Sequence, residues 1–138
     1  MKFVIATHGT FADGIRESIK LIAGEFKNLK SLSCYTREDF NLKEEINKIL
    51  NEGKDEEIIV VTDIFGGSVN NAFLERIPEN KNLYVISGLN LPLMLELLGE
   101  YEEYRDAESL IRASILNTND SVHFCNQEIN QNINDEEF

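Results

Sequence analysis

Apolar runs typical of strands alternate along this chain with stretches in which apolar residues recur at helical spacing. The runs at 3–6 and 57–62 are rich in β-branched and other apolar residues, as in strands buried on both faces. Residues 13–24 and 38–51 place apolar side chains three or four positions apart, which predicts amphipathic helices. The other expected elements are strands at 29–35, 83–87 and 121–124 and helices at 66–76, 91–98 and 106–116.

This order of elements predicts an α/β fold. Strands that alternate with helices form a mostly parallel, doubly wound sheet with helices on both faces. The sequence has no internal repeat and no linker, so we expect one domain over residues 1–125. Residues 126–138 are acidic, rich in Asn and poor in apolar side chains, and we expect a disordered tail there.

Composition excludes several classes of function. The chain of 138 residues has a formal net charge of -12, which disfavours broad binding to nucleic acid or to anionic membrane surfaces. Its two cysteines, Cys34 and Cys125, lack the spacing of metal ligands and lie in apolar stretches, so buried thiols are expected. No apolar run is long enough to span a bilayer, and residues 1–7 are too short for a signal segment. We therefore expect a cytoplasmic protein.

The residues that follow the strands are the candidates for function. In open parallel sheets, binding sites lie beyond the carboxyl ends of the strands. Three such segments stand out, at 7–10, 62–68 and 87–90. If the strands are parallel, these segments share one edge, where an imidazole (His8), a carboxylate (Asp63) and a pair of glycines before a helix converge.

These groups suit phosphoryl transfer. The neutral ring of His8 is a good nucleophile near pH 7, and its attack on phosphorus gives a labile phosphoramidate. Asp63 is positioned to hold the other ring nitrogen and to fix its tautomer. Gly66 and Gly67 allow close backbone approach, the helix start offers N–H groups, and Ser68 adds a hydroxyl donor.

Each group also has a plainer interpretation. His8 is then an ordinary polar residue at a strand end, Asp63 caps the following helix, and the glycine pair forms a turn. Convergence on one edge favours the chemical interpretation. His123, in the expected last strand, is interpreted as structural or surface-facing. Neither a nucleotide phosphate loop nor a dinucleotide glycine motif occurs, so we expect the phosphoryl group to come from another protein.

On three segments the sequence resembles a known family. They are 7–9 (THG), 63–68 (DIFGGS) with Asn71 after it, and 88–92 (GLNLP). Through them, residues 1–125 resemble the IIA components of the mannose-fructose-sorbose family of the bacterial phosphoenolpyruvate-dependent sugar phosphotransferase system. Many members have proline after the Gly-Gly-Ser/Thr, where this chain has Val69. Proline only pre-organises the first helical turn, so phosphate binding is expected to survive.

The resemblance implies a mechanism and partners. His8 is expected to accept a phosphoryl group from the phosphocarrier HPr and to donate it to a separate IIB protein, which serves a membrane IIC/IID complex. His8 and Asp63 are the expected catalytic residues, with Asp63 orienting the ring. No metal or cofactor is required. The expected phosphoryl-binding residues are Thr7, Gly9, Gly66, Gly67 and Ser68.

The resemblance also implies a homodimer, in which the strand at 121–124 crosses to the partner's sheet. Two other functions stay open: the phosphoryl-donor subunit of a dihydroxyacetone kinase, which typically lacks the Phe-Gly-Gly-Ser pattern, and a non-catalytic regulatory module on the same scaffold. The sequence does not identify the sugar, because specificity belongs to the other components.

Overall fold

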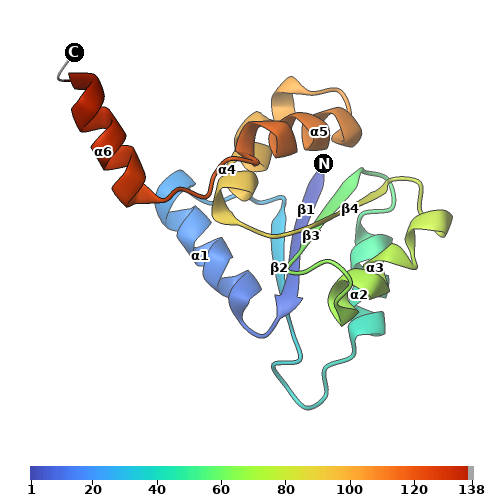
Figure 1. Cartoon of the computed structure of the whole chain (residues 1–138). Coiled ribbons are helices and arrows are strands. Elements are labelled where there is room, and N and C mark those ends of the chain that lie inside the picture. Colours follow the sequence, from blue (N-terminus) through green and yellow to red (C-terminus); the bar gives the residue numbers. More distant parts are fainter. Residues whose placement is uncertain (137–138) are drawn as a thin grey trace.

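The computed structural model describes residues 1–136, and it contains the four main strands and five helices that the sequence predicts, together with two 3-10 turns and a further C-terminal helix (Figure 1). The strands are β1 (Lys2–His8), β2 (Leu29–Cys34), β3 (Ile58–Thr62) and β4 (Leu83–Ser87). The helices are α1 (Phe11–Ala23), α2 (Leu42–Glu52), α3 (Ser68–Leu74), α4 (Leu91–Glu100), α5 (Ala107–Thr118) and α6 (Cys125–Glu136), with 3-10 turns η1 (Ile77–Glu79) and η2 (Tyr101–Glu103). None of the helices described is long and apolar enough to cross a membrane.

The four strands form one parallel sheet in the order β2-β1-β3-β4, which confirms the predicted α/β fold. The chain moves from β1 outward to β2, and then crosses to β3 on the other side of β1. The direction of winding therefore reverses between β1 and β3. A reversal of this kind leaves a crevice beyond the carboxyl ends of the two strands, because the loops after them turn to opposite faces of the sheet.

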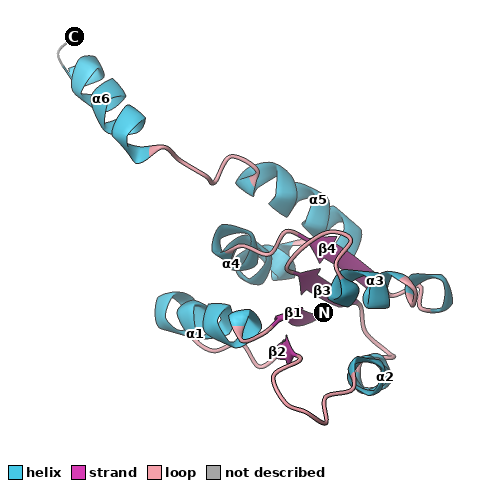
Figure 2. Ribbon diagram, turned by 60° about the horizontal axis from the view of Figure 1, so that its bottom comes forward, coloured by secondary structure: helices cyan, strands magenta, loops and turns pink. Residues whose placement is uncertain are grey.

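Helices cover both faces of the sheet (Figure 2). Alternate residues of β1 point to opposite faces, and each side has its own core. Phe3 and Ile5 pack with the apolar sides of α1, α4 and α5, whereas Val4 and Ala6 pack with α2 and α3. Every residue of β3 is buried. The central strands are thus packed from both sides, and the segments that follow them begin from fixed positions.

A buried threonine fixes the turn from β1 into α1. The Thr7 hydroxyl accepts a hydrogen bond from the Ala12 N–H at 2.8 Å, and both residues are fully buried. Thr10, at the helix start, caps no N–H group with its side chain. Gly9 has a φ of 62°, a conformation that favours glycine. Thr7 therefore anchors the helix start from inside the protein and sets the path of the chain around residue 8.

The C-terminal segment differs from the sequence prediction. Within the described chain, residues 121–124 pair with no strand, and Val122 is 95% exposed. The helix α6 projects away from the sheet in the stretch where the sequence predicts disorder (Figure 1). Residues 125–136 contain neither glycine nor proline, so no residue interrupts a helix there. The rest of the expected tail, 137–138, lies outside the described residues.

We expect Thr7→Val to destabilise the fold by about 1–3 kcal/mol, because the isosteric valine leaves the buried Ala12 N–H without an acceptor. Urea unfolding followed by circular dichroism measures the change. Thr118→Val is the matched control, since its hydroxyl donates only to the Ser114 carbonyl on a half-buried helix surface. Equal stability of the two variants would contradict the anchoring role of Thr7.

Candidate active site

His8 and Asp63 meet beyond the carboxyl ends of the neighbouring strands β1 and β3. His8 ends β1, and Asp63 follows β3 directly. One carboxylate oxygen of Asp63, Oδ2, lies 2.8 Å from His8 Nδ1 and accepts the His8 backbone N–H at 2.8 Å. The other, Oδ1, accepts the Ile64 N–H at 3.0 Å. The His8 side chain is 45% exposed and that of Asp63 is 14% exposed, so the ring is held from below and open to solvent.

These contacts assign the tautomer of the His8 ring. An ionised carboxylate can only accept, so Nδ1 carries the proton and Nε2 carries the free electron pair. The Ser68 hydroxyl lies 3.2 Å from Nε2 and is therefore the donor to it. Nε2 is thus the nucleophilic nitrogen of the ring, and it has the Ser68 hydroxyl beside it.

The pKa of Asp63 is lowered by its contacts. Burial is the largest single influence and raises the pKa, but several groups together outweigh it. They are the hydrogen bonds from the His8 N–H and ring, the charge of that ring, and the hydrogen bond from the Ile64 N–H. The carboxylate therefore stays ionised at neutral pH and can balance positive charge on the ring.

The glycines of the site act through shape. Their N–H groups already donate within the chain: Gly9 to Cys34 O at 2.9 Å, Gly66 to Asn70 Oδ1 at 3.2 Å and Gly67 to Ile64 O at 3.3 Å. Gly66 has a φ of 80°, which favours glycine. A Cβ on Gly67 would lie 3.3 Å from His8 Cε1. Gly66 thus permits the turn of the loop, and Gly67 leaves room for the ring.

A buried asparagine that the sequence analysis does not single out holds this loop. The Asn70 side chain accepts the Gly66 N–H and donates to the Thr62 hydroxyl at 2.9 Å. That hydroxyl in turn donates to Ile86 O on β4. Asn71 also donates to Gly66 O at 3.0 Å. A polar residue on the buried face of a short helix after a glycine pair is the signal that points to Asn70.

Tyr35 is a second site residue that the sequence analysis does not predict. Its hydroxyl lies 3.0 Å from Ser68 Oγ, and its ring centroid lies 5.8 Å from that of His8. Its φ of 63° is in the left-handed region, which costs an L-residue roughly 1–2 kcal/mol. The rule of examining each strand end, applied to β2 as well, would have found this residue.

Two buried side chains lie beneath the site and are not free to react. The Thr7 hydroxyl, an expected phosphoryl ligand, is fully buried and bonded to the start of α1. The Cys34 thiol, at the end of β2, has its pKa raised to about 12, chiefly by burial and further by the charge of Asp63. Both residues support the shape of the site from within.

Exposed apolar side chains accompany His8 along the same sheet edge. Ile64 and Phe65 follow Asp63 directly, and Phe65 is 79% exposed. Phe11 opens α1, and Tyr35 follows β2; both are about half exposed. Apolar side chains of this size, gathered around a reactive group, are typical of a surface that contacts another protein.

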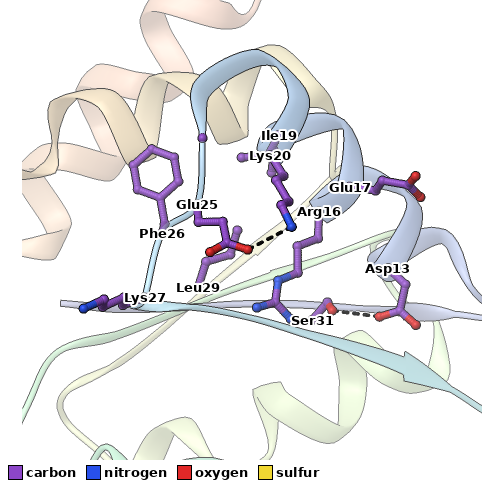
Figure 3. Close-up of a pocket in the computed structure, with 11 residues that line it drawn as sticks. Asp13, Arg16, Glu17, Ile19, Lys20, Glu25, Phe26, Lys27, Leu29 and Ser31 are labelled. Atoms are coloured by element: carbon purple, nitrogen blue, oxygen red, sulfur yellow. Dashed lines mark hydrogen bonds and ion pairs between the residues drawn. The ribbon is translucent and has the colours of Figure 1, made fainter.

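The hollow beside α1 is separate from this site. It has a volume of about 600 Å³ and lies between α1 and the outer edge of β2 (Figure 3). Its wall carries both signs of charge, with the Lys20–Glu25 ion pair at 3.0 Å and the Ser31–Asp13 hydrogen bond at 2.7 Å. None of the residues that line it belongs to the His8 site.

Comparison with known proteins gives a consistent result. Residues 2–115, which include every site residue above, match the family described as "PTS system fructose IIA component". The chain is 34% identical over 97 residues to a fructose-specific EIIA component of Bacillus subtilis, covering 69% of this chain and 66% of that protein, slightly under two thirds of its length.

Solved structures share the fold. A Klebsiella pneumoniae protein, described as a candidate permease of the phosphoenolpyruvate-dependent sugar phosphotransferase system, is 37% identical with a TM-score of 0.83, over 93% of each chain. The EIIA component from Streptococcus agalactiae is 26% identical with a TM-score of 0.81, over 91% of this chain and 98% of that one.

We expect Asp63→Asn to weaken the dependence of stability on acid pH. A carboxyl group whose folded pKa lies below its unfolded value of about 3.9 stabilises the fold fully above about pH 5, and this stabilisation is lost as the pH falls through the folded pKa. Urea midpoints at pH 6 and pH 3 should therefore differ less in this variant than in the wild type. Asp120→Asn, which removes an exposed carboxylate outside the site, should follow the wild type; a wild-type response in Asp63→Asn would contradict this assignment.

Proposed function

Because the chain belongs to the mannose, fructose and sorbose family of IIA components of the sugar phosphotransferase system, we propose that it is a phosphocarrier that accepts a phosphoryl group on His8 and passes it to another protein. One observation carries this proposal above all. The His8 side chain is 45% exposed, its Nδ1 is bonded to Asp63, and its Nε2 lies 3.2 Å from the Ser68 hydroxyl.

Nε2 is the accepting atom, since it holds the free electron pair. In the transfer, the N–P bond of a donor phosphohistidine breaks and its electron pair returns to the donor ring. The electron pair of Nε2 forms the new N–P bond. The His8 ring keeps its Nδ1 proton and gains positive charge, which the carboxylate of Asp63 balances at 2.8 Å. No proton needs to leave the site, and positioning supplies much of the rate.

The remaining site residues divide into three roles. Ser68 is the side-chain donor nearest to Nε2 and is assigned to a phosphoryl oxygen after transfer. Gly67 leaves space beside the ring, since a Cβ there would lie 3.3 Å from His8 Cε1, and Gly66 forms the turn at a φ of 80°. Thr7 and Gly9, which the sequence analysis assigns to phosphoryl binding, are assigned instead to fixing the turn that carries His8.

The partners follow from the family and from the surface. We assign HPr as the donor and a IIB protein as the acceptor. The apolar side chains around His8 suit a protein partner, and the net charge of -12 favours a partner with a basic face. A solvent-exposed ring is accessible to two proteins in turn, whereas an enclosed pocket would exclude both.

We also propose that the protein forms homodimers through residues 121–124. These residues belong to no helix or strand of the described chain, and they expose Val122 and Phe124. The sheet has two edges, β2 and β4, to which a strand from a second copy can add. Strand addition would satisfy backbone groups that are open to solvent in the single chain.

The phosphocarrier role is tested by labelling with phosphoenolpyruvate, enzyme I and HPr. We expect His8→Ala to lose all label, because no other group of the site offers a nucleophilic nitrogen. His123→Ala, which removes the other histidine, should be labelled like the wild type. The label should be lost in acid and kept in base. A labelled His8→Ala protein of unchanged circular dichroism would rule out the proposal.

For the dimer, we expect Val122→Asp to shift the protein toward the monomer, because a charge would have to be buried against the partner's sheet. Sedimentation velocity over a range of concentrations measures this. Leu21→Asp is the matched control, since Leu21 is also exposed (82%) but lies on α1. A shift of equal size in both variants, or in neither, would count against exchange through residues 121–124.

A further inference from the structure

We propose that Tyr35 is a positioning residue of this transfer, and that it acts by holding the hydroxyl of Ser68. The inference rests on the proposed function of His8. It starts from a chain of three contacts: Asp63 Oδ2 to His8 Nδ1 at 2.8 Å, His8 Nε2 to Ser68 Oγ at 3.2 Å, and Ser68 Oγ to the Tyr35 hydroxyl at 3.0 Å.

The chemistry of the groups fixes the direction of every hydrogen bond in this chain. Asp63 only accepts, so His8 Nδ1 donates and Nε2 accepts. Ser68 must then give its single proton to Nε2. Since the Ser68 proton is used, the Tyr35 hydroxyl is the donor to Ser68 Oγ. Tyr35 thus donates to a lone pair of Ser68 Oγ, and the Ser68 proton stays directed at His8 Nε2.

The surroundings of Tyr35 hold its ring in place. The ring packs edge-on against Phe40 with centroids 5.4 Å apart, and the Arg37 guanidinium lies 5.7 Å from the Phe40 ring centroid. Arg37 also pairs with Glu45 of α2 at 3.2 Å. The Tyr35 backbone has a φ of 63° while its side chain is half exposed. Burial therefore does not account for a tyrosine in this conformation, whereas its contact with Ser68 does.

The same arrangement serves the phosphorylated state. Once Nε2 has bonded to phosphorus it no longer accepts, and the Ser68 proton turns to a phosphoryl oxygen. Ser68 Oγ keeps accepting from Tyr35 during this turn. Tyr35 therefore limits the Ser68 hydroxyl to positions near the ring before and after transfer. Loss of the Tyr35 hydroxyl should destabilise the transition state and the phosphorylated state, and should leave the affinity for the partner protein unchanged.

Tyr35→Phe removes the hydroxyl and keeps the ring. With phosphorylated HPr as the donor, we expect kcat to fall about 3- to 10-fold, the range for one neutral hydrogen bond, with KM unchanged. Tyr104→Phe, outside the site, should match the wild type in both constants. An unchanged kcat in Tyr35→Phe, or a rise in KM alone, would overturn the inference while labelling of His8 still supports the proposed function.

A double-mutant cycle tests whether Tyr35 acts through Ser68. We expect the variant with both Tyr35→Phe and Ser68→Ala to be no slower than Ser68→Ala alone, because the hydroxyl has nothing left to position. Effects that multiply would show an independent role and overturn the inference. Urea midpoints equal to that of the wild type within error show that the variants fold normally. Tyr35→Phe is chosen because it retains the aromatic ring that packs against Phe40.

A chemical route separates this inference from the proposed function. Phosphoramidate phosphorylates histidine without any protein donor, and the hydrolysis rate of phosphorylated His8 can then be followed directly. We expect hydrolysis to be about 3- to 10-fold faster in Tyr35→Phe than in the wild type. Equal rates would overturn the role of Tyr35 even if HPr labels His8. Failure of HPr to label the wild type would instead defeat the proposed function, and the hydrolysis rates would still decide the role of Tyr35.

Discussion

The pairing of His8 with Asp63 is the interaction on which the rest of the site depends. A single carboxylate oxygen binds both the backbone N–H and the ring Nδ1 of His8. This fixes the position of the main chain and the orientation of the ring with one group. It also decides which ring nitrogen can react, since the proton is held on Nδ1. Removing the carboxylate would therefore disturb geometry, tautomer and charge balance together.

The fold makes this pairing possible by placing two central, buried strands side by side. β1 and β3 are parallel neighbours, and the register Ala6↔Thr62 brings their ends together. Neither strand can shift without disrupting the core on one face or the other. Buried polar contacts extend this rigidity to the loops: Thr7 anchors α1, and Asn70 joins the glycine loop to Thr62. Satisfied networks of this kind hold polar groups in one arrangement.

The buried strands that carry the site are packed from both sides, whereas the His8 ring and the loops around it are exposed to solvent. The ring, the glycine loop and the apolar residues around them lie at the surface, where a partner can approach and leave. Gly9, Gly66 and Tyr35 have positive φ close to the ring, and only for Tyr35, which carries a Cβ, does this conformation cost free energy. Strain of this kind persists where the surrounding structure determines the backbone, and it is often found at functional sites.

The sequence by itself determined the alternation of strands and helices, the parallel sheet and the edge at which His8, Asp63, Gly66, Gly67 and Ser68 meet. These follow from local rules, namely apolar periodicity and the common direction of parallel strands. Only the tertiary structure decided which polar groups are already bonded. It shows that the Thr7 hydroxyl and the glycine N–H groups already have partners within the chain, and that Tyr35 and Asn70 contact the site. Such hydrogen bonds join residues distant in sequence, as Tyr35 and Ser68 are, and no local pattern records which donor a given acceptor will find once the chain has folded.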